Sequence, residues 1–349
     1  MRLNLRVSII YLSLCALLVS NSTFAESSLS VPDIFIIGTM KGGTTSLEEM
    51  MSQHDQICFG QFQEKHYFDG QMKKQAYIKS YDDCKVSQLT LDKTPSYIRT
   101  ASAPKMIKDA YTTKELAKKK FILILRDPVA RMYSEYGMAC RYCDTLFHLD
   151  HHNETERIYI KNKRQQASMN IKQSNGRNEK DAIHYKMCKK VLTTSTIKDN
   201  VSALKDIKFI SFMKWLDTAK HISAGQYLNQ IENWTKHLPR SQLLVLQFDA
   251  LIQNTTDVSH VITNFLDLKH GFGSKVVLPK PNYSIRNETY NIDKIVIPEL
   301  TCQAVKRLHI LYEKQYTSLH EYINNAWNKP IMEPFWKPFS LNETLNKCV

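Results

Sequence analysis

The stretch from residue 33 to residue 46 constrains this chain more than any other part of its sequence. It begins with the apolar run Ile-Phe-Ile-Ile, passes through a turn that contains three glycines, and then reads as the start of a helix that reaches His54. An apolar run bounded by turn residues is typical of a strand that is covered on both faces of a parallel sheet. Glycines let a backbone approach a ligand closely, and the free N–H groups at the start of a helix attract an anion. The stretch therefore predicts a phosphate-binding turn followed by a helix over 45–54, with contacts from Lys41, Gly42, Gly43, Thr44, Thr45 and Ser46.

The position of the lysine in this turn bears on which phosphate compound it binds. A nucleoside-triphosphate loop has the pattern Gly-x4-Gly-Lys-Ser/Thr, in which the lysine reaches the β- and γ-phosphates. Gly38 and Gly43 have this spacing, but Thr44 stands where the lysine is needed and Lys41 lies inside the loop. The change argues against an ATPase or a small-molecule kinase and favours a nucleotide with a shorter 5′ chain.

The remaining regular segments predict the fold class. Strand-like runs occur at residues 88–92, 121–125 and 242–248. Helical patterns cover residues 129–140, 223–237, 258–266 and 297–322, and in the first of these Pro128 fits the first turn after Asp127 as N-cap. Strands separated by helices predict an α/β fold in three layers, with a central parallel sheet flanked by helices and ligands at the carboxyl ends of the strands.

The N-terminus and the compositional changes along the chain predict its organisation. Arg2 and Arg6 precede an apolar run of 13 residues, which is short against the about 20 residues of a membrane span. A cleaved signal peptide over 1–25 is therefore favoured over a signal anchor, and either one places the body of the protein outside the cytosol. We expect a Ser-rich linker at 26–31, one domain over 32–349, and a polar, basic insertion at about 144–208 within that domain.

Glycosylation signals and cysteines support that compartment. Seven Asn-x-Ser/Thr sequons lie beyond the leader, at Asn153, Asn200, Asn233, Asn254, Asn282, Asn287 and Asn342. Most cysteines beyond Cys15 are expected to pair and to leave at least one over; they are Cys58, Cys84, Cys140, Cys143, Cys188, Cys302 and Cys348. For the Cys-x2-Cys pair at 140–143 a structural disulfide role is favoured over a redox or metal role. The histidines at 148, 151 and 152 lack regular ligand spacing, so no metal is expected.

The net charge predicts an anionic partner. The formal charge is +13 at pH 7 and the pI is about 9.2. Such a surface suits nucleic acid, an anionic membrane or an acidic polysaccharide. The net charge alone does not distinguish among these three kinds of partner.

Two motifs in this sequence resemble a known enzyme family. Residues 38–47 resemble the 5′-phosphosulfate loop of sulfotransferases that use 3′-phosphoadenosine 5′-phosphosulfate (PAPS). The run Leu-Arg-Asp-Pro-Val-Ala-Arg-Met-Tyr-Ser-Glu-Tyr at 125–136 resembles their 3′-phosphate motif. The resemblance implies PAPS as co-substrate and a P-loop-like fold, and it adds Arg126 and Ser134 to the expected cofactor-binding residues. A guanidinium at the end of a strand suits this role because it grips a phosphate with two parallel hydrogen bonds.

Further segments resemble enzymes that modify glycosaminoglycans in the Golgi. Residues 63–69 resemble the Lys-Glu-x-His-Phe-Phe-Asp segment of heparan sulfate 3-O-sulfotransferases, and residues 93–97 resemble their Lys-Thr-Pro-x-Tyr loop. The GalNAc 4-sulfate 6-O-sulfotransferases share the Gly-Thr-Met-Lys loop. Resemblance extends over most of 32–322 but departs at 144–208 and 278–290, so the acceptor sugar stays open.

The chemistry of sulfate transfer suggests roles for individual residues. An acceptor hydroxyl must lose its proton as it attacks sulfur in line with the departing phosphate oxygen. Glu64 is the best candidate for the base, with His66 to assist it or to orient the acceptor. Lys41 would stabilise charge on the bridging oxygen, and Lys93 would neutralise the sulfuryl oxygens or hold the acceptor. The expected acceptor-binding residues are Glu64, Lys65, His66, Lys93, Thr94, Pro95 and Ser96.

The sequence thus favours a PAPS-dependent carbohydrate sulfotransferase of the Golgi lumen or membrane, or a secreted form of it. Its expected acceptor is a hydroxyl on a glycosaminoglycan-like polysaccharide; nucleic acid is not expected as a partner, and the membrane is reached only through an N-terminal anchor. The alternative from another class is a catalytically inactive, secreted polyanion-binding protein with the same fold. An N-sulfotransferase acting on amines shares these motifs and is also left open.

Overall fold

The computed structural model describes residues 29–147, 188, 211–212, 214–215, 221–272, 300–326 and 339. The predicted signal segment, most of the predicted insertion, the loop at 278–290 and nearly all of the tail therefore lie outside the described residues. Residues 29–31 fall in the expected linker, yet Leu29 is buried in the core and its N–H donates to the carbonyl of Ala110 at 3.0 Å. Packed structure therefore already includes Leu29, earlier than the boundary predicted at residue 32.

Five parallel strands form the centre of the fold, in the order β2-β3-β1-β4-β5. The predicted parallel α/β class is confirmed. The strands β1 (Ile34–Gly38), β4 (Lys120–Leu125) and β5 (Leu243–Gln247) have nearly continuous buried runs. Strand β3 (Leu89–Lys93) follows the predicted strand closely, whereas the two-residue edge strand β2 (Ile57–Cys58) carries too short a pattern to be recognised from sequence. Because the chain leaves β1 for β3 on one side and reaches β4 on the other, the strand order reverses at β1.

Alternate residues of β1, β4 and β5 contribute to two separate cores. In β1, Ile34 and Ile36 belong to one apolar cluster, while Phe35 and Ile37 belong to the other. This division follows from the two-residue period of a strand, in which neighbouring side chains point to opposite faces. Both faces of the sheet are therefore covered by apolar residues, as the unbroken apolar runs predict.

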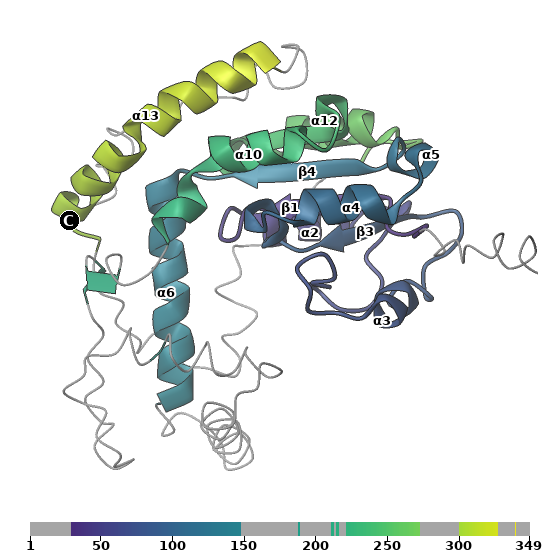
Figure 1. Ribbon diagram of the computed structural model, residues 1–349, viewed down its shortest axis with the longest axis horizontal. Coiled ribbons are helices and arrows are strands. Elements are labelled where there is room, and N and C mark those ends of the chain that lie inside the picture. Colours follow the sequence, from purple (N-terminus) through teal and green to yellow (C-terminus); the bar gives the residue numbers. More distant parts are fainter. Residues whose placement is uncertain are drawn as a thin grey trace, which may run out of the picture.

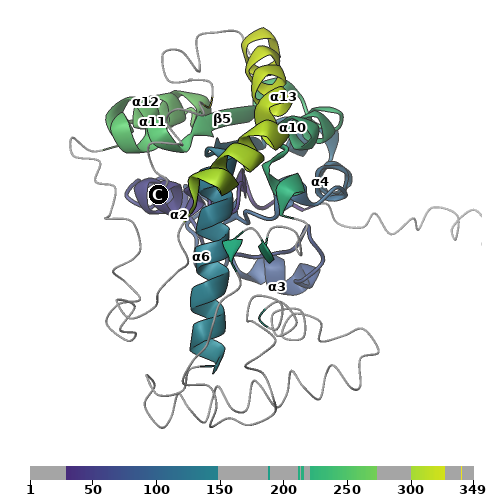
Figure 2. The ribbon, with the colours of Figure 1, turned by 90° about the vertical axis from the view of Figure 1, so that its left-hand side faces the viewer.

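Helices cover the two faces and give the three layers. Helices α2 (Thr44–Met51), α11 (Phe248–Gln253) and α12 (Thr255–Leu266) pack on the Ile34 face. Helices α4 (Ala103–Ala110) and α10 (Tyr227–Thr235) pack on the Phe35 face, together with the last part of α13 (Cys302–Ala326). In Figure 2 the first group lies on one side of β5 and the second group on the other.

Helix α6 (Pro128–Phe147) extends away from the sheet below the strands, as both ribbon views show (Figures 1 and 2). Asp127 caps it, because its Oδ1 accepts a hydrogen bond from the Ala130 N–H at 2.8 Å, as the sequence predicts. The helix continues seven residues beyond the predicted end at Cys140, into the first residues of the predicted insertion. Its apolar side packs against the first half of α13 around Met132, Leu308 and Tyr312.

Several predicted boundaries need correction. Helix α2 ends at Met51 rather than at residue 54, and α12 begins three residues before the predicted start at Val258. The helix predicted over 223–237 is divided into a 3-10 turn, η4 (Ile222–Gly225), and the shorter α10. Helix α13 begins at Cys302 and ends at Ala326, later at both ends than predicted. The short elements α3 (Lys74–Lys79), η1 (Tyr97–Arg99), α5 (Thr113–Leu116) and η5 (Arg240–Gln242) complete the described fold.

Cysteines tie loops to this fold. Cys58 at the end of β2 is bonded to Cys84, and Cys143 of α6 is bonded to Cys188. Cys302 is also disulfide-bonded, while Cys140 is buried and belongs to no disulfide. The prediction that most cysteines pair and at least one is left over agrees with this pattern, but the disulfide role predicted for Cys140 is wrong. These disulfides indicate an oxidising compartment of the secretory pathway.

Among the described helices we find none with the length and apolar character needed to cross a membrane.

Candidate active site

The carboxyl ends of three neighbouring strands bring the predicted site residues to one edge of the sheet. Strands β1, β3 and β4 are parallel and adjacent, so the loops that follow them leave from the same edge. The loop after β1 carries Lys41, the loop after β3 begins at Thr94, and Arg126 follows β4. This edge includes the point where the strand order reverses, which is where open α/β sheets bind ligands.

The loop over residues 39–43 is closely fitted to the end of β4. The Thr39 N–H donates to the carbonyl of Ile124 at 2.9 Å, and the Gly42 N–H donates back to the carbonyl of Thr39 at 2.8 Å. A Cβ at Gly42 would lie 2.8 Å from both of those carbonyl oxygens, so the fold leaves no space for a side chain there. Lys41 has a left-handed backbone with φ 65°, a conformation that is uncommon for a residue with a side chain. Such backbone conformations concentrate at functional sites.

The start of α2 offers free backbone donors beside this loop. Gly43, with φ 103°, occupies the N-cap position and provides no side-chain hydrogen bond. The Leu47 N–H donates to the carbonyl of Gly43, so the N–H groups of residues 44–46 precede the first intrahelical bond. Those groups and the helix dipole favour an anion, which supports the phosphate-binding role predicted for residues 41–46.

Arg126 joins the second motif to this loop. Its Nη1 donates to the carbonyl of Lys41 at 3.5 Å, and its guanidinium lies 4.8 Å from the ring centre of Phe248. Its own carbonyl accepts a hydrogen bond from the Tyr227 hydroxyl at 2.8 Å, which fixes the turn into α6. Ser134 lies about two turns along α6 and is partly exposed. The structure thus places Arg126 beside the loop of the first motif, with Ser134 on the helix that Arg126 precedes.

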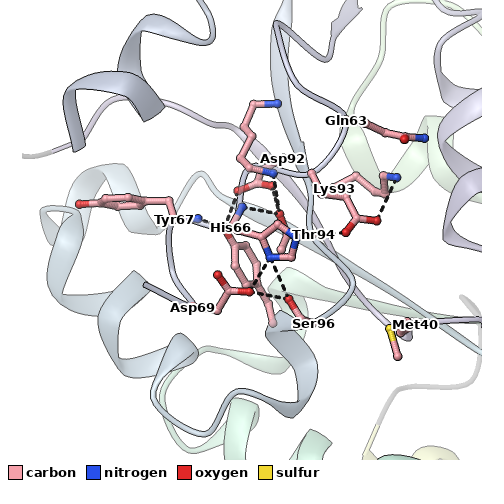
Figure 3. A network of polar contacts seen from close by, with 12 residues as sticks. Met40, Gln63, His66, Tyr67, Asp69, Asp92, Lys93, Thr94 and Ser96 are labelled. Atoms are coloured by element: carbon pink, nitrogen blue, oxygen red, sulfur yellow. Dashed lines mark hydrogen bonds and ion pairs between the residues drawn. The ribbon is translucent and has the colours of Figure 1, made fainter. Parts of the chain in front are cut away.

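A chain of polar contacts connects Glu64, His66, Asp69 and Ser96. Figure 3 shows the part of this chain from His66 through Asp69 to Ser96. The His66 Nε2 lies 3.2 Å from Glu64 Oε2, and the His66 Nδ1 donates to Asp69 Oδ2 at 2.6 Å. The Ser96 hydroxyl donates to the same oxygen of Asp69 at 2.6 Å. His66 therefore bridges two carboxylates, and its backbone is also left-handed, with φ 54°.

These contacts set the charges of the bridge. The hydrogen bond to Asp69 and then that to Glu64 raise the pKa of His66 to about 9, despite its partial burial. Burial alone would raise the pKa of Glu64, but the hydrogen bond from His66 and the charge of Lys93 outweigh it and hold that pKa below its usual value. At neutral pH the site therefore holds an imidazolium and an ionised Glu64 carboxylate, which is 41% exposed.

Lys93 contacts the same carboxylate from the end of β3. Its Nζ lies 2.8 Å from Glu48 Oε2 and 3.5 Å from Glu64 Oε1, and its side chain is 1% exposed. Glu48 comes from α2, so this lysine links the helix behind the phosphate-binding turn to the loop that carries Glu64. The structure thus brings Glu64, His66 and Lys93 together as predicted.

A buried hydrogen-bond network joins the loop that begins at Thr94 to the loop that carries His66. Asp92 accepts hydrogen bonds from the hydroxyls of Tyr77, Tyr97 and Thr94 at 2.8, 3.0 and 2.6 Å. The Thr94 hydroxyl in turn accepts from the backbone N–H of His66 at 3.3 Å. Burial raises the pKa of Asp92, and the hydrogen bonds from Thr94, Tyr77 and Tyr97 offset part of this effect. Thr94 thus positions the loop of His66.

Lys65 points into the protein. Its Nζ donates to the backbone carbonyls of Phe59 and Phe62 at 2.7 and 3.3 Å, and it lies 4.8 Å from the ring centre of Tyr81. The side chain is buried, and burial lowers its pKa. The acceptor contact predicted for Lys65 finds no support in this placement, because its ammonium group closes the loop from within.

A family model described as "Sulfotransferase domain" matches residues 31–279, which is more than half of the chain. The chain belongs to the sulfotransferase domain family. The resemblance found in the sequence is thereby confirmed.

Relatives of this sulfotransferase domain are distant. A membrane-associated sulfotransferase (kil1) of Dictyostelium discoideum is 24% identical over 276 residues, which cover 69% of this chain and 57% of the relative. The human heparan sulfate glucosamine 3-O-sulfotransferase 5 is 23% identical over 242 residues, which cover 68% of this chain and 54% of the relative. The chain thus spans about half the length of the curated relatives that it matches.

A solved structure supports the fold of this sulfotransferase domain. A sulfotransferase from Alicyclobacillus acidocaldarius matches with a TM-score of 0.50 at 15% sequence identity. The match covers 84% of this chain and 96% of the bacterial protein. At this identity the likeness concerns the arrangement of strands and helices.

Several residues of the candidate active site were not expected from the sequence. Asp69 and Glu48 pair with the predicted His66 and Lys93, and a second charged cluster around Glu135 lies on α6. Asp69 stands at the end of the recognised segment 63–69, three residues after His66, and that spacing was the available signal. Glu48 lies on α2, far in the sequence from its partner Lys93, so no local sequence pattern predicts this pair.

A further group has donor atoms suited to a metal ion. In the described part of the chain, His54, Asp55 and His270 place one ligand atom each within 4.8 Å of one another. The Nδ1 of His54 accepts from the Gln56 N–H at 3.2 Å, and its Nε2 lies 2.9 Å from the carbonyl of His270. Both ring nitrogens of the buried histidine therefore already have protein partners.

Proposed function

We propose that this chain transfers the sulfuryl group of PAPS to a hydroxyl of a carbohydrate chain. Membership of the sulfotransferase domain family supports the reaction class. The closely fitted loop with Lys41 and the start of α2 supply donors for the 5′ end of the nucleotide, and Arg126 and Ser134 supply donors for its 3′-phosphate. The donor set fits a nucleotide that carries phosphate at both ends.

The observation that carries this proposal is the ionised, half-exposed Glu64 held between His66 and Lys93. Both partners meet Glu64 at the sheet edge that also bears Lys41. A base must be accessible to its substrate and must lie beside the electrophile. The Glu64 carboxylate is 41% exposed, with the buried Lys93 behind it and the partly buried His66 beside it, and so meets the first requirement.

The reaction then needs few groups. Glu64 takes the proton of the acceptor hydroxyl as the acceptor oxygen bonds to sulfur, and the bond between sulfur and the bridging phosphate oxygen breaks. Lys41 compensates the negative charge that develops on that oxygen. Lys93 is buried beside Glu64 and holds its carboxylate in place, rather than contacting the sulfuryl oxygens itself. His66, which keeps its own proton at neutral pH, orients the Glu64 carboxylate; this assigns it the orienting role rather than that of the base.

We further propose a glycosaminoglycan-like acceptor and a place in the Golgi lumen. The formal charge of +13 suits a polyanion, and one of the relatives is named as a heparan sulfate glucosamine 3-O-sulfotransferase. The disulfides of the described region fit a lumenal location.

The variant Glu64→Gln tests the role of the base. It keeps the shape of the side chain but removes its proton affinity, so we expect transfer of sulfate from labelled PAPS to fall by about 100-fold or more. The affinity for PAP, measured by calorimetry, should stay within about twofold.

The matched control is Glu313→Gln, a surface carboxylate on α13, which should leave both measurements unchanged. Full activity in Glu64→Gln would remove Glu64 from the mechanism. A parallel loss of PAP affinity would show that Glu64 supports the nucleotide site instead.

A further inference from the structure

Two arginines approach one buried carboxylate beside the phosphate-binding loop. Arg131 Nη1 lies 2.8 Å from Glu135 Oε2, one turn away on α6, whereas Arg99 Nη1 lies 3.8 Å from Glu135 Oε1. The His221 Nδ1 contacts that second oxygen at 3.2 Å. The two arginines differ in exposure, because the Arg131 side chain is completely buried and that of Arg99 is 39% exposed.

The charges of this cluster do not cancel. The hydrogen bond from His221 and the charge of Arg131 overcome the opposing effect of burial and hold the pKa of Glu135 at about 2. Glu135 therefore carries one negative charge, while each guanidinium carries a permanent positive charge. Arg131 makes the short contact with Glu135, so the surplus positive charge resides on the exposed Arg99.

The location of Arg99 connects this charge to the candidate active site. Arg99 ends η1, which follows the Thr94–Ser96 turn directly, and its N–H donates to the carbonyl of Ser96 at 3.2 Å. The Trp234 Nε1 anchors this element by donating to the carbonyl of Ile98 at 3.3 Å. The Arg99 Nη2 lies 3.7 Å from the sulfur of Met40, the residue before Lys41.

The guanidinium thus lies between the two loops that carry Lys41 and Ser96. Its long contact to Glu135 and its contact to the Met40 sulfur hold it in place without occupying its hydrogen-bond donors fully. An arginine held in this way binds a carboxylate or sulfate at little cost in side-chain entropy, because its position is set before the ligand arrives.

We propose that Arg99 is an acceptor-binding residue that selects acceptors with an anionic group, sulfate or carboxylate, close to the hydroxyl to be sulfated. This inference rests on the proposed sulfotransferase function and deepens it. Glu135 acts on the acceptor indirectly, as the positioning residue for Arg99.

The test uses the full-length protein and three forms of one glycosaminoglycan: native, desulfated and carboxyl-reduced. Arg99→Gln should raise the KM for the native polymer about tenfold or more, since it removes hydrogen bonds from a charged donor to an anion. The KM for PAPS should not change. The form whose KM is indifferent to Arg99→Gln identifies the group that Arg99 binds, whether sulfate or carboxylate. Arg99→Lys should restore part of the affinity through its charge alone.

The control is Lys105→Gln, which removes an exposed cation on α4 that pairs with Asp109 and should leave all three KM values unchanged. An equal rise in KM for all three forms, no rise for the native form, or a rise in the KM for PAPS would each overturn the proposal.

A binding measurement separates this proposal from the proposed function. Calorimetric titration of the PAP-bound protein with native and desulfated polymer needs no turnover. If wild-type protein transfers no sulfate yet Arg99→Gln weakens binding of the native polymer tenfold, Arg99 still binds the anion and the enzymatic function fails. If transfer occurs and neither KM nor binding depends on Arg99, the enzymatic function stands and the role of Arg99 fails.

Discussion

At the scale of single residues, the site is organised by a histidine that keeps its proton. His66 lies between Asp69 and Glu64, and both carboxylates stabilise the charged ring. The raised pKa of His66 also contributes to folding stability, and this contribution is fully present below pH 6.5 and is lost as the pH rises through about 9. The depressed pKa of Glu64 has the opposite sign, because its contribution is present above about pH 4.5 and is lost as the pH falls further.

The charge on His66 predicts a specific pH dependence. In wild-type protein, sulfate transfer should decline at high pH around the pKa of His66, near 9, because a neutral ring orients Glu64 less firmly. Asp69→Asn removes the largest cause of the raised pKa, so this decline should move toward the ordinary pKa of 6.5. The pH profile of kcat and an NMR titration of the His66 ring measure the two quantities independently.

Asp109→Asn serves as the control for this experiment, since it changes an exposed carboxylate on α4 that pairs with Lys105. A decline that stays near pH 9 in Asp69→Asn would mean that another group controls the high-pH limb.

Sequence reasoning found the residues of this site that lie inside recognisable motifs. Glu64, His66 and Lys93 were predicted and do meet, because their segments follow neighbouring parallel strands or pack against them. The direction of the Lys65 side chain could not be predicted. It is set by the backbone carbonyls of Phe59 and Phe62, and these converge on the lysine only when the loop is folded. Glu135 was passed over because its partners Arg99 and His221 come from distant parts of the sequence.

At the scale of elements, the loop between β1 and α2 depends on the end of β4. The closest neighbours of Gly42 are backbone and side-chain atoms of Thr39 and the carbonyl of Ile124, and backbone atoms do not move aside as a flexible side chain does. A methyl group at Gly42 would therefore displace the loop and with it the donors that face the nucleotide.

We accordingly expect Gly42→Ala to lower PAP affinity at least tenfold and to destabilise the fold by about 1–3 kcal/mol. Gly271→Ala is a matched control, because a Cβ there would meet no atom within 4 Å. Calorimetry with PAP and urea unfolding give the two values. Unchanged PAP affinity in Gly42→Ala would show that the nucleotide does not depend on the shape of this loop.

The elements differ in how well the sequence predicts them. Strands β1, β4 and β5 were found because burial on both faces leaves unbroken apolar runs, whereas β3 was found from its alternation of apolar and polar residues. Helix ends were predicted less well, as in η4 and α10, where a tight turn replaces the first turn of helix. A Cβ at Gly225 would lie within 2.9 Å of atoms of Tyr312 and Pro128, so these two residues leave no space for a side chain in that turn. Such a boundary is set by α6 and α13, which lie far away in the sequence.

At the scale of the whole molecule, the disulfide between Cys58 and Cys84 joins the edge strand to the segment after α3. It spans 26 residues of chain, and these include Glu64, His66 and Asp69. A cross-link over a loop of this length stabilises a fold by about 2–4 kcal/mol, chiefly by restricting the unfolded chain.

The variant Cys58→Ser is therefore expected to lower the free energy of unfolding by about 2–4 kcal/mol. Urea unfolding followed by circular dichroism measures this change. Cys84→Ser and the double variant should give the same loss, since all three lack the same bridge. An unfolding midpoint equal to that of wild type would contradict the structural role of the disulfide.

The position of this disulfide makes the acceptor half of the site depend on thiol oxidation, and the nucleotide half independent of it. The loop that it closes carries the proposed base, whereas the phosphate-binding turn lies outside it. A chain kept under reducing conditions would therefore still assemble the nucleotide half of the site, while the acceptor half would lack its tether. Thiol oxidation belongs to the secretory route, where the proposed acceptor polymer is also found. The protein would thus become able to transfer sulfate only after it has entered the oxidising compartment and the disulfide has formed.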